Sequence, residues 1–172
     1  MIFLTVGTTH PFDRLALVVD RAIALHLITE PVCAQLGSSV YHPQHYAAVA
    51  TLDKPSFDAR LREAAAIISH AGMGIMTQAL QAGKPLLAMP RLARFGEVVN
   101  DHQVALAETF ARAGHILIAH DEEEFCVQVG RLRDFVPTER NPQRDRLIQR
   151  VCAFLERNGA CPEPTQVLER VR

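Results

Sequence analysis

Short apolar runs that alternate with helical patterns constrain the fold of this chain most strongly. Apolar residues recur at helical spacing between the runs, most clearly over 75–82 and 101–112. The runs are bounded by glycine, proline or polar residues, as buried strands usually are, and cover 1–6, 32–36, 65–69, 86–89 and 116–119. This alternation predicts an α/β fold, a single Rossmann-like domain with a doubly wound parallel sheet.

The length of the chain, 172 residues, is that of one ordinary domain, so we expect a single domain over 1–172. Its arginine-rich end carries apolar residues at helical spacing, which predicts a C-terminal helix over about 142–157 that packs on the domain or on a partner. A formal net charge of -1 gives no electrostatic case for binding nucleic acid.

The cysteines and the apolar segments indicate the compartment. The four cysteines form no CxxC pair, and no signal peptide precedes the first apolar run. The apolar stretches are far shorter than the ~20 residues that span a bilayer. We therefore expect a reduced, cytoplasmic protein that reaches a membrane only through a surface or a partner.

Three glycine-containing loops follow predicted strands: Gly7-Thr8-Thr9-His10, Gly37-Ser38-Ser39 and His70-Ala71-Gly72-Met73-Gly74. In an open parallel sheet, ligands bind beyond the carboxyl ends of the strands. Glycine lets backbone N–H groups approach a ligand, and a helix N-terminus favours an anion, which suits a diphosphate. Each loop alone fits a tight turn equally well. Three such loops on one rim favour an anion cradle.

Two common nucleotide motifs do not fit. Thr77 stands where the nicotinamide-dinucleotide fingerprint needs its third glycine, and that motif does not follow the first strand. Gly83-Lys84 is followed by Pro85, so the P-loop signature is absent as well.

A polar segment over 90–103 follows the predicted strand 86–89 and offers donors and acceptors for sugar hydroxyls. The alternative is a capped helix start, with Asn100 or Asp101 as the cap. That alternative leaves His102 and Gln103 without a role.

Together these motifs resemble the C-terminal domain of glycosyltransferase family 28, and within it the stand-alone subunits of the PssE and Alg13 type. The resemblance covers about residues 1–120 and rests on Val6–Thr9, Pro11–Leu15, Ile68–Gly74, Ala79–Pro85, Pro90-Arg91, Gly96-Glu97 and Asp101–Gln103. It implies the donor-binding half of a GT-B glycosyltransferase. The acceptor-binding half would belong to a membrane-anchored partner similar to PssD or Alg14, which would hold this chain at the cytoplasmic membrane face.

The resemblance also implies a reaction. It is the inverting transfer of glucuronate or N-acetylglucosamine from a UDP-sugar to a lipid-linked acceptor, in exopolysaccharide or glycan biosynthesis, with no metal or cofactor and with the general base on the partner. The alternative is a non-catalytic nucleotide-sugar-binding or scaffold subunit of a polysaccharide assembly complex.

Carried over by position, the resemblance implies that one group of residues flanks the diphosphate and that another joins the donor-sugar site. The first group is Gly7, Thr8, Thr9, His70, Gly72, Met73 and Gly74. The second is Asp101, His102 and Gln103, and Arg91 and Glu97 are further residues expected to bind substrate. Gln78 stands where the family usually has a glutamate that accepts hydrogen bonds from both ribose hydroxyls. Because a neutral amide accepts through one oxygen, we expect either weaker nucleotide binding or a ribose that is held differently.

Overall fold

The computed structural model of the chain describes residues 1–139 and 144–157. The chain divides into two compact units, Met1–Arg140 and Asn141–Arg172. The first unit holds a six-stranded sheet, whose neighbouring strands all run parallel in the order β3-β2-β1-β4-β5-β6. The predicted α/β class with a parallel sheet is confirmed.

The strands alternate with helices along the first unit. The strands are β1 (Ile2–Thr5), β2 (Val32–Gln35), β3 (Ala47–Val49), β4 (Ala66–His70), β5 (Leu86–Met89) and β6 (Leu117–Ile118). The helices are α1 (Asp13–Ala24), α2 (Lys54–Glu63), α3 (Met73–Gln81), the short 3₁₀ helix η1 (Ala93–Phe95), α4 (His102–Arg112) and α5 (Glu122–Leu132).

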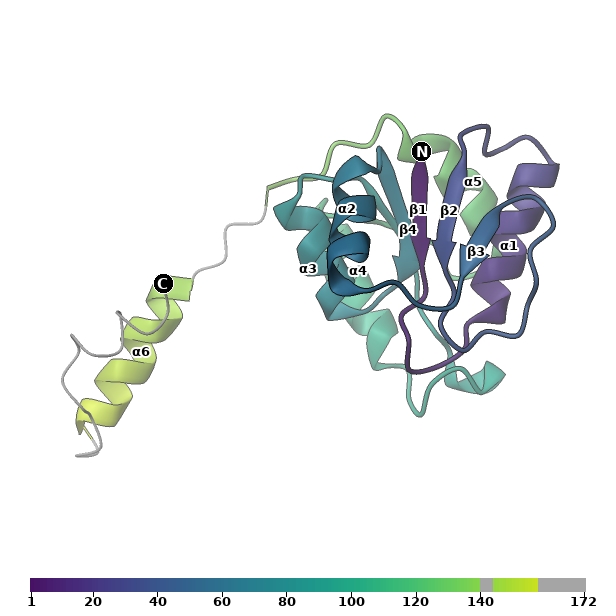
Figure 1. Cartoon of the computed structure of the whole chain (residues 1–172). Coiled ribbons are helices and arrows are strands. Elements are labelled where there is room, and N and C mark those ends of the chain that lie inside the picture. Colours follow the sequence, from purple (N-terminus) through teal and green to yellow (C-terminus); the bar gives the residue numbers. More distant parts are fainter. Residues whose placement is uncertain (140–143, 158–172) are drawn as a thin grey trace. The chain divides into compact units, whose positions relative to one another are not determined.

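Helices cover both faces of the sheet. Figure 1 shows α1 and α5 on one face and α2, α3 and α4 on the other. Along β1, Leu4 packs with α1 and α5, whereas Phe3 points to the opposite face and packs with the other three helices. Both side chains are fully buried. Apolar residues on both faces are what a central parallel strand needs, and each such side chain stabilises the fold by roughly 1.5–3 kcal/mol.

The strand order reverses direction between β1 and β4. β2 and β3 lie on one side of β1, whereas β4, β5 and β6 lie on the other. Helices on the two sides cover opposite faces, so the loops that follow β1 and β4 leave a crevice at the carboxyl edge of the sheet. Two of the three glycine loops therefore lie at the point where doubly wound folds bind ligands.

Besides the short η1, two elements of the structure, β3 and α2, were not predicted from the sequence. Strand β3 is exposed at the sheet edge and consists of Ala47, Ala48 and Val49, a weak strand signal. Helix α2 buries Leu61, and the partly buried Phe57 ring packs edge-on against Phe3, with the ring centroids 5.3 Å apart. Asp53 caps the helix, and its side chain accepts from Ser56 N at 2.9 Å. Pairing with β2 places β3, and packing on the sheet together with the cap places α2, so neither element depends on a strong periodic apolar pattern of its own.

The second unit contains α6 (Arg144–Arg157). It lies where a helix over about 142–157 was expected, and residues 142 and 143 are outside the described residues. Its packing on the domain or on a partner stays a prediction. None of the helices in the described residues combines the length and the hydropathy that a membrane span needs.

Candidate functional site

The three glycine loops touch one another at the carboxyl edge of the sheet. A Cβ atom on Gly37 would lie 2.3 Å from the carbonyl oxygen of Gly7, and a Cβ atom on Gly7 would lie 3.2 Å from Cε1 of His70. A Cβ atom on Gly72 would lie 2.3 Å from Nε2 of the same ring. Gly7 and Gly37 also have φ angles of 78° and 59°, which favour glycine. The loops therefore need glycine for mutual contact as well as for their turns.

His70 lies against both Gly7 and Gly72, at the last position of β4. The Ser69 hydroxyl donates to the carbonyl oxygen of Thr5, so its oxygen is left to accept from His70 Nδ1, 3.3 Å away. This arrangement assigns the ring proton to Nδ1 and leaves Nε2 bare. Burial, together with the positive charge of Arg91, lowers the pKa of His70 to about 4. The ring is neutral at pH 7.

Backbone donors lie beside this ring. Helix α3 begins at Met73, and its N-cap residue, Gly72, has no side chain to cap the helix. The first N–H groups of a helix lack partners within it and carry partial positive charge, so they suit an anion. Met73 and Gly74 are exposed there, as are Thr8 and Thr9 in the first loop. These predicted diphosphate residues are accessible to a ligand.

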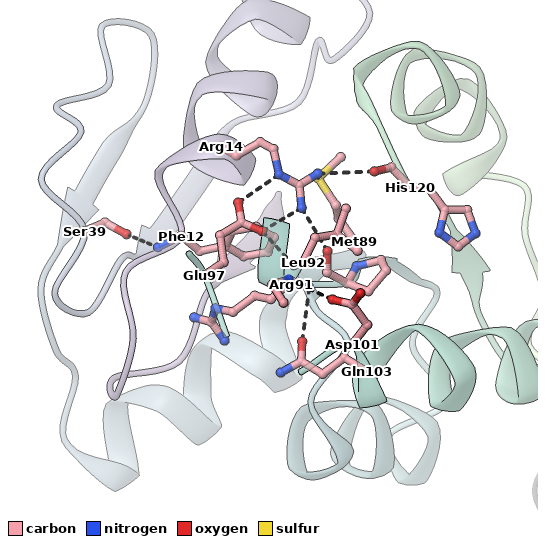
Figure 2. Close-up of polar contacts among 12 residues, drawn as sticks. Phe12, Arg14, Ser39, Met89, Arg91, Leu92, Glu97, Asp101, Gln103 and His120 are labelled. Atoms are coloured by element: carbon pink, nitrogen blue, oxygen red, sulfur yellow. Dashed lines mark hydrogen bonds and ion pairs between the residues drawn. The ribbon is translucent and has the colours of Figure 1, made fainter. Parts of the chain in front are cut away.

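Arg91 lies beneath the first loop and is 4% exposed. Its Nη2 donates to the carbonyl oxygens of Val6 at 2.6 Å and His10 at 2.7 Å. Its guanidinium carbon lies 5.0 Å from the centroid of the Phe12 ring. Figure 2 shows the Arg91 side chain extending toward this loop. Arg91, predicted to contact substrate, thus makes its contacts inside the protein, where it holds both ends of the first loop.

The Glu97 side chain also makes its hydrogen bonds inside the protein. Its carboxylate forms a bidentate pair with Arg14, with Nε–Oε1 at 2.8 Å and Nη2–Oε2 at 2.9 Å, and Oε2 also accepts from Leu92 N at 2.9 Å (Figure 2). Arg14 donates further to the carbonyl oxygens of Pro90 at 2.9 Å and His120 at 3.2 Å. This cluster ties α1 to the loops that follow β5 and β6. Arg14 was absent from the predicted site; its only signal was its place in a family motif.

The predicted sugar-binding residues after β5 have mixed roles. Asp101 is the N-cap residue of α4, but its carboxylate accepts from Ala93 N at 2.7 Å instead of capping the helix. Gln103 Oε1 accepts from Arg91 N at 3.2 Å, and its amide nitrogen has no hydrogen-bond partner in the described part of the chain. His102 is exposed and bonds to Asn100. The free donor of Gln103 and the exposed His102 ring are available to a ligand.

Gln78 lies on α3 and is half-buried. Its side chain makes no hydrogen bond to any residue that the structure describes, so it is available to a ligand. Over the same residues, no three His, Cys, Asp or Glu side chains gather to hold a metal ion.

Comparison with known proteins decides the family. The sequence model of the glycosyltransferase family 28 C-terminal domain matches residues 1–137. The chain belongs to glycosyltransferase family 28. The "UDP-N-acetylglucosamine transferase subunit ALG13" of Homo sapiens is 32% identical over 124 residues, which cover 67% of this chain and 10% of that protein. The Mus musculus protein of the same name is 32% identical over 126 residues, which cover 66% of this chain and 10% of that protein. The chain thus matches about a tenth of the length of these family 28 relatives.

Solved structures share the fold of this family 28 domain. An NMR solution structure of ALG13 has a TM-score of 0.58 at 16% identity, covering 85% of this chain and 93% of that one. A glycotransferase of kitacinnamycin has a TM-score of 0.58 at 20% identity, covering 77% and 34%. A UDP-GlcNAc 2-epimerase from Neisseria meningitidis has a TM-score of 0.54 at 14% identity, covering 78% and 36%. An epimerase among them means that the fold alone does not decide the reaction. The expected likeness to Alg13-type subunits is confirmed; the likeness to PssE stays a prediction.

Proposed function

We propose that this chain is the UDP-sugar-binding subunit of a two-component inverting glycosyltransferase that acts on a lipid-linked acceptor. The observation that carries the proposal is the mutual contact of three glycine loops at the carboxyl edge of the sheet, with Gly7 and Gly72 both against His70. Backbone donors from the loop after β1 and from the start of α3 meet there. The human and mouse relatives, named as UDP-N-acetylglucosamine transferase subunits, support the same function.

The chemistry follows from where charge develops. As the sugar leaves UDP, negative charge builds on the diphosphate. N–H groups of the Gly7–Thr9 loop and the first turn of α3 stabilise that charge without a metal ion, in the same way as an oxyanion hole. The acceptor hydroxyl attacks from the opposite side of the sugar. The general base that takes its proton belongs to the partner.

The ribose and the donor sugar contact residues along the same carboxyl edge of the sheet. Gln78 on α3 holds the ribose hydroxyls, and the donor sugar lies against Asp101, His102 and the free amide nitrogen of Gln103. The names of the relatives favour N-acetylglucosamine as the donor sugar, and glucuronate in an exopolysaccharide pathway is the other sugar that we propose to test.

The partner completes the site. We place the acceptor-binding half on a membrane-anchored subunit of the PssD or Alg14 type, which holds this chain at the cytoplasmic face of the membrane. The word "subunit" in the names of the relatives supports a partner. The other half of the catalytic cleft is then supplied in trans.

Two measurements test the proposal. Calorimetry of the purified chain with UDP is expected to show binding, and no binding at millimolar UDP would refute the function. Turnover of radiolabelled UDP-N-acetylglucosamine and UDP-glucuronate is then compared with and without membranes that carry the partner. Transfer only with the partner supports a two-component enzyme. Full activity of the chain alone contradicts it, and UDP binding without transfer under any condition favours the scaffold alternative.

A further inference from the structure

Arg91 carries a buried positive charge that no carboxylate contacts. The residue is 4% exposed, and within 1–139 and 144–157 no Asp or Glu oxygen lies within ion-pair distance of its guanidinium. Glu97, whose charge acts on it, has both its oxygens paired with Arg14. Nε of Arg91 is buried without a hydrogen-bond partner in the same part of the chain. A buried charge is normally paired, so the protein leaves a counter-charge to be supplied.

The hydrogen bonds of Arg91 place its charge against the Gly7–Thr9 loop. Nη2 of Arg91 holds the carbonyl oxygens of Val6 and His10, the residues that bracket the Gly7–Thr9 loop. In a trans peptide the C=O and N–H groups point in opposite directions. Because the Val6 carbonyl points at Arg91, the N–H group of Gly7 points away from it, to the other side of the loop. Arg91 therefore fixes the direction of a donor in the candidate cradle.

The charge also acts across the cradle. Arg91 contributes to the lowered pKa of His70, which contacts both Gly7 and Gly72. The field of the guanidinium thus reaches the glycine loop after β4, at the other side of the crevice. An anion between these loops lies within the same field.

We propose that Arg91 is a positioning residue whose unpaired charge is balanced by the diphosphate of the bound nucleotide, acting through the Gly7–Thr9 loop without touching the ligand. The proposal rests on the proposed function and assigns to Arg91 a role beneath the loop instead of a contact with the sugar. The competing explanation is a purely structural tie, in which only the two hydrogen bonds to the loop matter.

Two substitutions separate the effect of the Arg91 charge from the effect of its hydrogen bonds to the loop. Arg91→Lys keeps the charge and loses the planar fork, whereas Arg91→Gln keeps a donor and loses the charge. Binding of UDP and of uridine to the whole chain is measured by calorimetry at one fixed ionic strength. Arg62→Gln, which removes an exposed arginine on α2, is the matched control and leaves both affinities unchanged.

For Arg91→Gln we expect UDP binding to weaken at least about tenfold and uridine binding to change less than about threefold, because only the diphosphate carries charge. Arg91→Lys is expected to stay within about threefold of the wild type for both ligands. NMR titration provides a second readout: the pKa of His70 rises in Arg91→Gln and not in Arg91→Lys.

The proposal is overturned if Arg91→Lys loses as much UDP affinity as Arg91→Gln, or if uridine binding falls in parallel with UDP binding. If Arg91→Gln does not fold, Arg91→Lys decides: near-wild-type UDP binding supports the proposal, and a loss of tenfold or more overturns it. A wild-type chain that binds neither ligand refutes the proposed function instead, so the two failures are distinguishable.

Discussion

The imidazole of His70 occupies the space into which a side chain on Gly72 would project, with Nε2 2.3 Å from the position of such a Cβ atom. Gly72→Ala therefore forces the ring or the loop to move. We expect the free energy of unfolding to fall by about 1–3 kcal/mol, and UDP binding to weaken because the start of α3 shifts. Urea denaturation and calorimetry measure the two effects.

Gly74→Ala is the matched stability control for this change. A Cβ atom on Gly74 would meet no atom within 4 Å, and the residue is already helical. Alanine is favoured over glycine in a helix, so we expect a gain in stability of up to about 1 kcal/mol. Equal destabilisation by the two substitutions would contradict a steric role for His70.

The neutral His70 ring makes stability depend on pH. Its pKa is lowered from 6.5 to about 4, so above pH 6.5 the ring is neutral in both the folded and the unfolded chain and contributes no pH dependence. As the pH falls from 6.5 toward 4, the unfolded chain takes up a proton that the folded chain does not, and the free energy of unfolding decreases. The loss is about 2 kcal/mol at pH 5.

Urea denaturation at pH 7 and pH 5 checks this prediction. Other groups also titrate in this range, so the wild type is compared with His70→Asn, whose amide keeps a donor for Ser69. The wild type should lose about 2 kcal/mol more than the variant between the two pH values. Parallel losses in the two proteins would show that His70 does not resist protonation.

Removal of the Arg14–Glu97 pair tests the tie between α1 and the loop after β5. In Glu97→Gln the Arg14 guanidinium loses its anionic partner while 20% exposed, and we expect a loss of about 2–3 kcal/mol. Glu122→Gln is the control, because the Arg21–Glu122 pair is exposed, with Nη1 of Arg21 donating to both carboxylate oxygens, and its removal should cost less than about 1 kcal/mol. Thermal denaturation of the two variants measures both losses of stability. Similar losses would mean that burial does not strengthen the inner pair.

The sequence predicts the parts of the fold that depend on burial. Runs such as 86–89 are apolar because both faces of a central parallel strand are covered, and β5 (Leu86–Met89) has the same bounds. β3 and α2 were missed because neither has the periodic apolar pattern that burial produces: β3 is exposed, and α2 buries only Leu61. Such elements depend on neighbours that a single sequence does not reveal.

For the candidate site, the sequence identifies the loops but not the direction in which charged side chains point. Gly7 and Gly72 could be proposed from glycine chemistry at strand ends, and the structure brings both against His70. Arg91 and Glu97 look like ligand-binding residues because they are charged and follow a strand. In the structure both are buried: Arg91 bonds to the loop after β1, and Glu97 bonds to Arg14 on α1. Burial of a charged residue is set by tertiary packing, which local sequence does not encode.

Gln78 offers a test of nucleotide affinity. A carboxylate accepts hydrogen bonds through two oxygens and makes stronger, charge-assisted bonds than an amide. We therefore expect Gln78→Glu to tighten UDP binding by about three- to tenfold, since one such bond contributes roughly 1 kcal/mol. Calorimetry with UDP and with 2′,3′-dideoxy-UDP measures the effect, and the gain should vanish with the ligand that lacks both ribose hydroxyls.

The control for this substitution is Gln81→Glu, which adds the same charge at an exposed position of the same helix. Its effect on UDP binding should be small and unfavourable, because it brings a second anion toward the diphosphate without touching the ribose. Tighter binding in both variants would indicate a general effect of charge on α3. Weaker binding in Gln78→Glu with both ligands would place Gln78 away from the ribose, and the nucleotide would then have to lie differently along α3.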